Sequence, residues 1–442
     1  MSAGFAGLPR IDLRPEQTGG SPCAEASAAW RVQCSRSAGL DGAADDAART
    51  ILADVRARGD AAIFDCVEKF EKRTITAADL EVSRERWQSA GSNVSEQVRE
   101  AIELAARRVH LFHRTQKFPT TGVEKEGWSL HSRAAPLSRV AVYAPGGTAA
   151  YPSSVLMAGI PAKVAGVREV FLLTPRASDV VLHAASIAGI DRVFEVGGAQ
   201  AIAAAAFGTD TIPRVDKIVG PGNAYVTAAK RQVFGVCDVD GIAGPSEILV
   251  MADASADAEL VAADLISQAE HDPEACAILV TDAPELPAAV DAALTRQLSD
   301  LPRADVAIAS LREHGAAVLV PDLSGMIQAA NDYAPEHLEL LIERAEVIAP
   351  ALTRAGAIFV GAWTPEAAGD YTAGPSHVLP TAGAARFGSP LGVWDFMKYT
   401  SVLKLDRTAL EAQAEAITVL ARAEGLEGHA RAVECRLKDN DA

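Results

Sequence analysis

A glutamine and a histidine three residues apart are the first pair whose types and spacing could do chemistry. Gln268 and His271 lie at the end of Asp257–Glu270, a segment whose apolar pattern predicts a helix. A spacing of three places both side chains on one helical face, where an amide oxygen and an imidazole could share a metal ion. A histidine near a helix C-terminus is also favoured by the helix dipole alone, so the pair leaves both interpretations open.

Further candidate ligands lie in segments without regular periodicity. Asp370 and His377 belong to an irregular Gly/Thr/Pro-rich stretch after Gly369, and His429 lies near the end of the sequence. Imidazole nitrogen combined with carboxylate and amide oxygen suits zinc or a similar divalent cation. The alternative is that Asp370 and His377 are turn-forming or surface residues.

An adjacent acid and imidazole, Glu336 and His337, follow Pro335. Neighbouring side chains on regular structure diverge, so the two can act together only at a turn or a helix start, which Pro335 favours. They would provide two separate proton acceptors, as a two-step oxidation requires. The equally good alternative is that Glu336 stabilises the first turn of a helix.

Three glycine-containing loops each follow a predicted strand. They span Tyr143 to Thr148, Gly197 to Gln200, and Gly220 to Asn223. Ligands bind outside the carboxyl ends of strands in open α/β sheets, and glycine lets a backbone approach a phosphate. The loops therefore predict a nucleotide pocket, although glycines in tight turns explain each loop equally well. The dinucleotide motif G-x-G-x-x-G is missing.

The segments that position these residues alternate between β-branched runs and Ala-rich helices beyond Arg139. The strands expected from this alternation are Val140–Tyr143, Glu169–Leu173, Arg192–Val196, Lys217–Val219, Glu247–Met251, Ala277–Thr281, Ala317–Val320, Glu346–Ile348 and Ala357–Val360. Helices are expected over 41–72, with a break at Gly59, over 95–114 and over 407–425; a strand-like tail follows. We predict an α/β fold with two Rossmann-like doubly wound units, incomplete because they lack the strict glycine motif, a helical N-terminal layer and a small C-terminal tail domain.

Composition excludes several classes of function. Of the 442 residues, 49% are hydrophobic. The chain has 41 Lys and Arg residues and 58 Asp and Glu residues, which gives a formal net charge of −17. This acidic balance argues against binding to nucleic acid or to anionic membranes. No apolar run reaches the ~18 residues of a membrane span, and the N-terminus does not resemble a secretion signal. The six scattered cysteines predict reduced thiols in a cytoplasm.

Together the motifs resemble those of histidinol dehydrogenase, from about Leu8 to Leu437. The matching stretches are VAVYAPGG, VGGAQAIAAAAFGTD, KIVGPGNAYVTAAKR, GIAGPSEILVMAD, DLISQAEHD, NDYAPEHLELL, GDYTAGPSHVLPT and EGLEGHARAV. Residues 16–38 match poorly and are expected to touch no catalytic position.

The resemblance implies a set of site residues. The acid/base pair would be Glu336 and His337. One zinc ion per subunit would be held by Gln268, His271, Asp370 and His429. NAD would face Tyr143, Gln200 and Asn223. The substrate would be surrounded by Ser246, Gln268, His271, His337, Asp370, His377, Glu424 and His429.

The resemblance also implies the reaction and the assembly. L-histidinol would be oxidised through bound L-histidinal to L-histidine, consuming two NAD+. The family is a homodimer, in which Glu424 and His429 would complete the partner's site. The implied division is an N-terminal arm (1–38), a first Rossmann-like unit with the helical layer and the metal and catalytic residues (39–142 plus 250–388), a second unit with the NAD-binding loops (143–249), and a dimerisation tail (389–442).

Three other functions remain open from the sequence. A related zinc- and NAD-dependent enzyme could oxidise another polar alcohol, such as a sulfonated diol. A metal-dependent hydrolase could use Glu336 to activate water, but the three glycine loops would then be unexplained. A non-catalytic protein would bind zinc or NAD without turnover.

Overall fold

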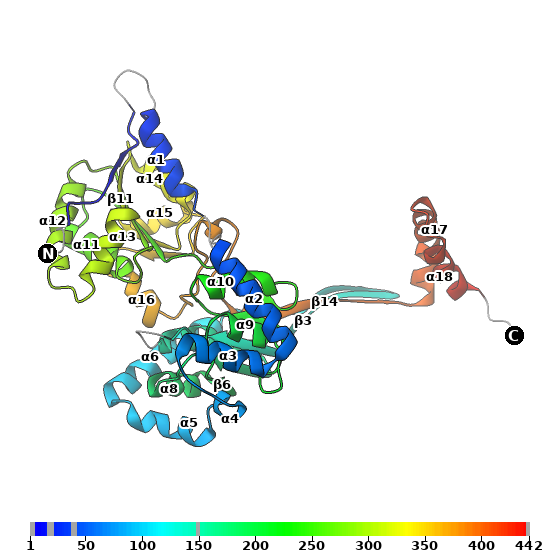
Figure 1. The fold of residues 1–442 in the computed structure, drawn as a ribbon. Helices are drawn as coiled ribbons and strands as arrows, with labels where there is room; N and C mark the ends of the chain where they lie inside the picture. The colour runs from blue at the N-terminus through cyan, green and yellow to red at the C-terminus, as the bar shows by residue number, and fades with distance from the viewer. Residues whose placement is uncertain (1–4, 16–21, 37–41, 147–150, 439–442) are drawn as a thin grey trace.

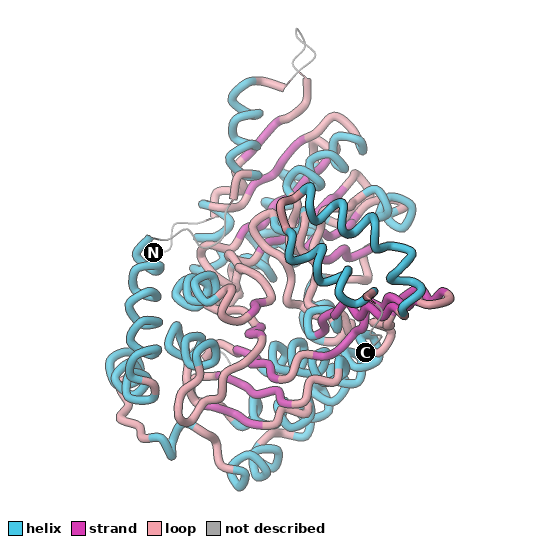
Figure 2. The backbone as a smooth tube through the Cα atoms, turned by 90° about the vertical axis from the view of Figure 1, so that its right-hand side faces the viewer, coloured by secondary structure: helices cyan, strands magenta, loops and turns pink. Residues whose placement is uncertain are grey.

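Two parallel sheets and one antiparallel ribbon organise the part of the chain that the computed structural model describes, residues 5–15, 22–36, 42–146 and 151–438 (Figure 1). Figure 2 shows the two sheets one above the other with loops between them. None of the described helices has both the length and the apolar character needed to cross a membrane.

The five-stranded sheet has the order β6-β5-β4-β7-β8, with every pair parallel. Its strands are β4 (Arg139–Tyr143), β5 (Glu169–Leu173), β6 (Arg192–Phe194), β7 (Lys217–Val219) and β8 (Asp238–Val239). The chain enters at the central strand β4, builds the sheet outward to β6, and then returns to the other side of β4 with β7. The order of strands therefore reverses between β4 and β7.

Helices cover both faces of this sheet in two layers. On one face lie α7 (Pro152–Ala165) and α8 (Asp179–Ala188), with α5 (Arg84–Ala90) and α6 (Glu96–His113) outside them; on the other lie α9 (Gly198–Phe207) and α10 (Ala224–Val233), with α2 (Gly42–Arg58) and α3 (Asp60–Glu71) outside them. A short helix α4 (Ala77–Leu80) joins the layers.

The predicted grouping of residues 39–142 with residues 250–388 is wrong. Apolar side chains of α2 and α3 share one buried cluster with α9 and α10, and β4 is the central strand of the five-stranded sheet. The helical layer and β4 therefore belong with residues 143–249, because that is where their apolar faces are buried.

The six-stranded sheet has the order β1-β11-β10-β9-β12-β13 and is also parallel. Its strands are β1 (Arg10–Asp12), β9 (Glu247–Ala252), β10 (Cys276–Thr281), β11 (Ala316–Leu319), β12 (His337–Leu341) and β13 (Ala357–Val360). One face is covered by α11 (Ala258–Ala269), α12 (Leu286–Leu298) and α13 (Ala304–Glu313), and the other by α1 (Ala24–Cys34), α14 (Leu323–Tyr333) and α15 (Ala345–Ile348). Strand order reverses between β9 and β12, as it does between β4 and β7.

The predicted N-terminal arm is partly built into this sheet. Strand β1 pairs with β11, and α1 packs on α14, where the Trp30 and Tyr333 rings stack with centroids 5.8 Å apart. Residues 1–4, 16–21 and 37–38 of the arm lie outside the described residues.

Most expected strands and helices are confirmed to within a few residues, with two exceptions. The expected strand at Glu346–Ile348 is part of helix α15, and the expected strand-like tail forms helix α18 (Glu427–Leu437). The sequence pattern does not predict β1, β2, β3, β8, β12 or β14; at β12, the preceding Pro335 is compatible with a helix start as well as with a turn.

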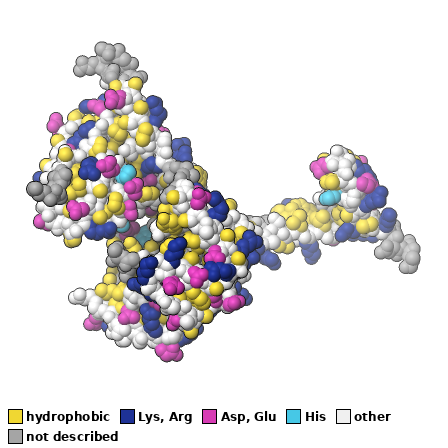
Figure 3. Space-filling view, in the orientation of Figure 1, with side chains coloured by type: hydrophobic (Ala, Val, Ile, Leu, Met, Phe, Trp, Pro, Cys, Tyr) yellow, Lys and Arg dark blue, Asp and Glu magenta, His cyan; other side chains and the backbone are white. Residues whose placement is uncertain are grey.

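An antiparallel ribbon carries the C-terminal helices away from both sheets (Figure 1). It consists of β2 (Thr121–Lys125), β3 (Trp128–Pro136) and β14 (Met397–Leu405), in the order β14-β3-β2. Helices α17 (Arg407–Ala423) and α18 pack on each other beyond its end. Hydrophobic side chains lie along the surface of the ribbon (Figure 3).

Gly220 lies where the loop after β7 passes close to the backbone at the end of β4, so replacing it measures what this close approach contributes to stability. Gly220 has φ +117°, and an added Cβ would collide with the carbonyl oxygen of Tyr143, whereas Gly235 has φ +95° and open space around it. Both alanine variants bear backbone strain of about 1–3 kcal/mol, but only Gly220→Ala must also displace backbone. In urea unfolding, we expect Gly220→Ala to lose clearly more stability than Gly235→Ala. Equal losses would mean that this close approach does not constrain the sheet.

Candidate active site

The predicted acid and imidazole lie at the amino end of β12, beside the amino end of β9. His337 is the first residue of the strand and Glu336 precedes it, directly after the turn through Ala334 and Pro335. Of the two expected settings the structure has the turn and not the helix start, and the alternative of a helix-stabilising Glu336 is wrong. Both side chains are buried. The backbone of Glu247, the first residue of β9, binds both: its N–H donates to Glu336 Oε2 (2.9 Å), and its carbonyl lies 2.9 Å from His337 Nδ1.

This contact fixes the protonation of His337. A carbonyl only accepts hydrogen bonds, so Nδ1 carries the proton and Nε2 keeps a free lone pair. Burial lowers the pKa of the imidazole to about 4, which keeps it neutral at ordinary pH. His337 is therefore arranged as a proton acceptor at Nε2.

Glu336 is held in a different electrostatic state. Burial, and then the carboxylate of Glu247, raise its pKa well above the usual value, while the Glu247 N–H stabilises the ionised form. A carboxyl group of raised pKa beside a neutral imidazole gives two proton acceptors of different basicity in one site.

The candidate metal ligands meet at the end of α11. Gln268 is buried, with its Nε2 3.2 Å from His271 Nδ1, and His271 Nε2 lies 4.0 Å from Asp370 Oδ2. The Gln268 Oε1 atom is buried without a hydrogen-bond partner among the described residues. An unpaired buried amide oxygen beside an imidazole and a carboxylate fits a zinc ion as the missing partner.

Sequence reasoning missed one acid of this cluster, Glu366. It lies four residues before Asp370 on helix α16 (Glu366–Tyr371), directly after Pro365, and that spacing was the available signal. Ligand atoms of His337, Glu366 and Asp370 lie within 4.8 Å of one another. Burial, and then the Asp370 carboxylate, raise the pKa of Glu366 to about 8; its Oε2 accepts from Ser267 Oγ (2.9 Å).

His377 joins this cluster to the other sheet. Its Nδ1 lies 3.1 Å from the carbonyl oxygen of Asp370, and its Nε2 lies 3.4 Å from Ser154 Oγ near the start of α7. Ser246 immediately precedes β9, where its carbonyl accepts from the N–H of Cys276 (2.9 Å).

Glu424 and His429 are not brought to this cluster within one chain. Both are exposed at the junction and start of the last two helices, at the far end of the ribbon (Figure 1).

Residues 147 and 148 of the first predicted nucleotide loop lie outside the described residues; the described residues of the three loops lie close together at the carboxyl edge of the five-stranded sheet. The Tyr143 hydroxyl accepts from the N–H of Gly198 (3.1 Å), and Gly220 approaches the Tyr143 carbonyl. Gln200 is buried in the first turn of α9. The Asn223 side chain has a structural role, because its Oδ1 accepts from the N–H groups of Tyr225 and Val226 (3.1 Å each) at the start of α10.

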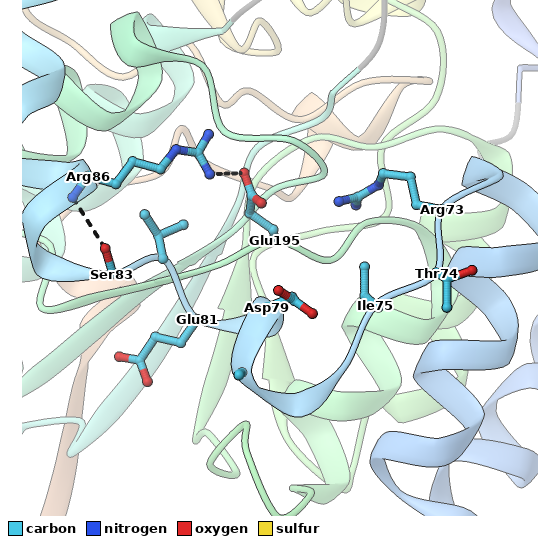
Figure 4. A pocket seen from close by; sticks show the side chains of 10 residues that line it. Arg73, Thr74, Ile75, Asp79, Glu81, Ser83, Arg86 and Glu195 are labelled. Atoms are coloured by element: carbon cyan, nitrogen blue, oxygen red, sulfur yellow. Dashed lines mark hydrogen bonds and ion pairs between the residues drawn. The ribbon is translucent and has the colours of Figure 1, made fainter.

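A cavity of about 520 Å³ lies elsewhere, between the segment that contains α4 and the end of β6. Arg86 donates to Glu195 (2.9 Å) at one side of it, and Asp79 and Glu81 line the other (Figure 4). The predicted site residues do not line this cavity.

Comparison with known proteins assigns the chain to a family. The model of the family described as histidinol dehydrogenase matches residues 35–437. Histidinol dehydrogenase of Chromobacterium violaceum is 48% identical over 405 residues, covering 90% of this chain and 93% of the relative, and that of Rhizobium meliloti is 49% identical over 395 residues, covering 88% and 91%. The crystal structure of histidinol dehydrogenase from Elizabethkingia anophelis superposes with a TM-score of 0.89 at 34% identity, covering 100% of both chains.

The raised pKa of Glu366 predicts a pH-dependent stability difference. A carboxyl group whose pKa rises to about 8 on folding favours the folded state below its unfolded pKa, and this contribution is lost as pH rises through 8. Glu366→Gln does not titrate, so in chelator-treated protein its melting temperature should rise relative to wild type between pH 5 and 9, by at least about 2 °C. The exposed Glu346→Gln is the control. A difference independent of pH would contradict the raised pKa.

Proposed function

Because this chain belongs to the histidinol dehydrogenase family of NAD-dependent oxidoreductases, we propose that it carries out both oxidations from L-histidinol through bound L-histidinal to L-histidine, the last two steps of histidine biosynthesis. One observation carries the proposal. The backbone N–H and carbonyl of Glu247 hold a carboxyl group and a neutral imidazole side by side in a buried site. Two successive oxidations need two proton acceptors, which these groups would supply.

In the first oxidation His337 takes the hydroxyl proton of histidinol at Nε2 while hydride leaves for the nicotinamide. The Nδ1–H bond to the Glu247 carbonyl keeps the ring oriented and strengthens its basicity. Burial keeps the resting imidazole unprotonated, so no proton has to be removed before the reaction.

In the second oxidation Glu336 takes a proton from a water molecule as the hydroxide adds to the aldehyde. The resulting hydrate anion would lose a second hydride to a second NAD+, leaving the carboxylic acid, which ionises to the carboxylate of L-histidine. The N–H of Glu247 stabilises the carboxylate before it accepts the proton. The aldehyde stays bound between the two steps, which requires a site closed to bulk water.

The donor set supports one zinc ion per subunit, held by Gln268, His271, Asp370 and the partner subunit's His429. Zinc at this position supplies orientation of the substrate imidazole and amine. The substrate would also meet Ser246, His337, His377 and the partner subunit's Glu424.

For NAD+ we propose the carboxyl edge of the five-stranded sheet, where strand order reverses between β4 and β7. Nucleotides bind at such reversals in Rossmann-like units. Tyr143 ends β4, and Gln200 and Asn223 lie at the starts of α9 and α10, the helices that follow β6 and β7. Two NAD+ would be consumed per histidinol.

The tail supports a homodimer in which each C-terminal segment (389–442) completes the partner's site. Leu403, Val419 and Leu420 are each more than half exposed, although they are large apolar side chains. Such a surface is typical of a protein interface. We assign this metabolic enzyme to the cytoplasm.

The assignment predicts a stoichiometry. With L-histidinol as sole substrate at alkaline pH, we expect two NADH per histidinol consumed, loss of turnover after chelation, and recovery with zinc. The absorbance of NADH and the amount of histidine formed measure this. Folded, zinc-loaded dimer that forms no NADH would contradict the assignment, and turnover of a sulfonated diol would identify the alternative substrate.

Completion of the site by the partner predicts complementation between two inactive variants. His429→Ala and Glu336→Gln should each abolish turnover. A refolded equal mixture should regain roughly a quarter of wild-type activity, because half the dimers are mixed and each has one site with both residues. Mixing His429→Ala with the double variant Glu336→Gln/His429→Ala is the control and should regain none. Without recovery in the first mixture, the two residues would act within one chain.

A further inference from the structure

Glu247 connects the acid and imidazole to a buried carboxylate. Its backbone N–H and carbonyl bind Glu336 and His337, and its side chain is 2% exposed. The side-chain Oε1 accepts from the N–H of Ala382 (2.9 Å), which anchors the segment after His377. The position of this one residue therefore controls the position of both proton acceptors.

The counter-ion of Glu247 comes from the N-terminal segment. Arg36 follows α1, and its Nη1 lies 2.8 Å from Glu247 Oε1. Its Nη2 donates to the carbonyl oxygen of Tyr333 (2.9 Å), and the guanidinium carbon lies 3.4 Å from the centroid of the Tyr333 ring. A planar guanidinium can make all three contacts at once, which a lysine cannot.

The two residues that Arg36 binds both adjoin the acid and the imidazole, one along the chain and one across the sheet. Tyr333 is the last residue of α14, and the chain turns through Ala334 (φ +53°) and Pro335 to reach Glu336. Glu247 holds the same pair from β9. The guanidinium thus links the segment that leads into Glu336 to the strand that binds it.

We propose that Arg36 is a positioning residue for Glu336 and His337, acting through Glu247 and the Tyr333 carbonyl. The expectation that residues 16–38 include no catalytic position stands, because Arg36 contacts Glu247 and Tyr333 and not the acid or the imidazole. The inference rests on the proposed function, because turnover of histidinol and histidinal is its readout.

The test compares Arg36→Met with Arg36→Lys and with Arg31→Met, an exposed arginine of the same segment. We expect Arg36→Met to lower kcat for both histidinol and histidinal by about 10- to 100-fold, because small misplacements of reacting groups cost this much. The KM for NAD+ should change less than about twofold, since the expected NAD residues lie on the other sheet. Arg36→Lys should recover part of kcat, and Arg31→Met should match wild type.

A double-mutant cycle with Glu247→Gln separates positioning from stability. Arg36→Met leaves a buried carboxylate without its cation, whereas Arg36→Met/Glu247→Gln leaves no buried charge and should fold where the single variant does not. If Arg36 acts through Glu247, the loss of kcat in the double variant is well below the product of the two single losses.

Three results would overturn the inference: kcat of folded Arg36→Met within about twofold of wild type, losses that multiply independently in the cycle, or wild-type turnover in Arg36→Lys and the double variant when Arg36→Met fails to fold. Wild-type protein without turnover would refute the proposed function itself. Active wild type with an equally active Arg36→Met would refute the role of Arg36 alone.

Discussion

The register between β9 and β12 is the constraint on which the rest of the site depends. His337 lies opposite Ile248, and this register brings the backbone N–H of Glu247 to Glu336 and its carbonyl to His337. A slip of one residue would turn the imidazole to the other face of the sheet and separate the carboxyl group from its amide donor. Buried ionisable groups without such partners are strongly destabilising, so the register and the chemistry are determined together.

The proposed site is assembled from opposite edges of two sheets, whose strands follow the same order apart from the added β1. The loops proposed to bind NAD+ lie, in their described part, at the carboxyl edge of the five-stranded sheet, as the general rule for α/β folds predicts. The acid, the imidazole and the end of α11 lie at the amino edge of the six-stranded sheet, where that rule would not place them. Because His377 touches Ser154 on α7, the two edges face each other. Hydride transfer requires the donor and the acceptor to be in contact. Because the two edges face each other, one sheet can bind the donor and the other sheet the acceptor.

Local sequence pattern predicts most of the central parallel strands but not the contacts between distant elements. The β-branched runs located most of the parallel strands, and the spacing of Gln268 and His271 correctly placed both at one end of a helix. Strand β12 is not predicted, because Pro335, two residues before it, is equally compatible with a helix start. Arg36 carries no local signal at all: its partners Glu247 and Tyr333 are distant in sequence, and only the packing of α1 on α14 brings them together.

The C-terminal tail extends this dependence on distant partners beyond a single chain. Few side chains are buried in α17 and α18, so the pair cannot form a substantial core of its own. The ribbon nevertheless carries it far from the sheets, with Leu403, Val419 and Leu420 exposed. An arm that binds the body of another copy forms a closed dimer if the second copy returns the same contact; a contact that is not returned closes only as a larger ring, and otherwise copies add without end. The proposed reciprocal dimer satisfies this condition, buries the apolar surface, and gives both sites the same complement of tail residues.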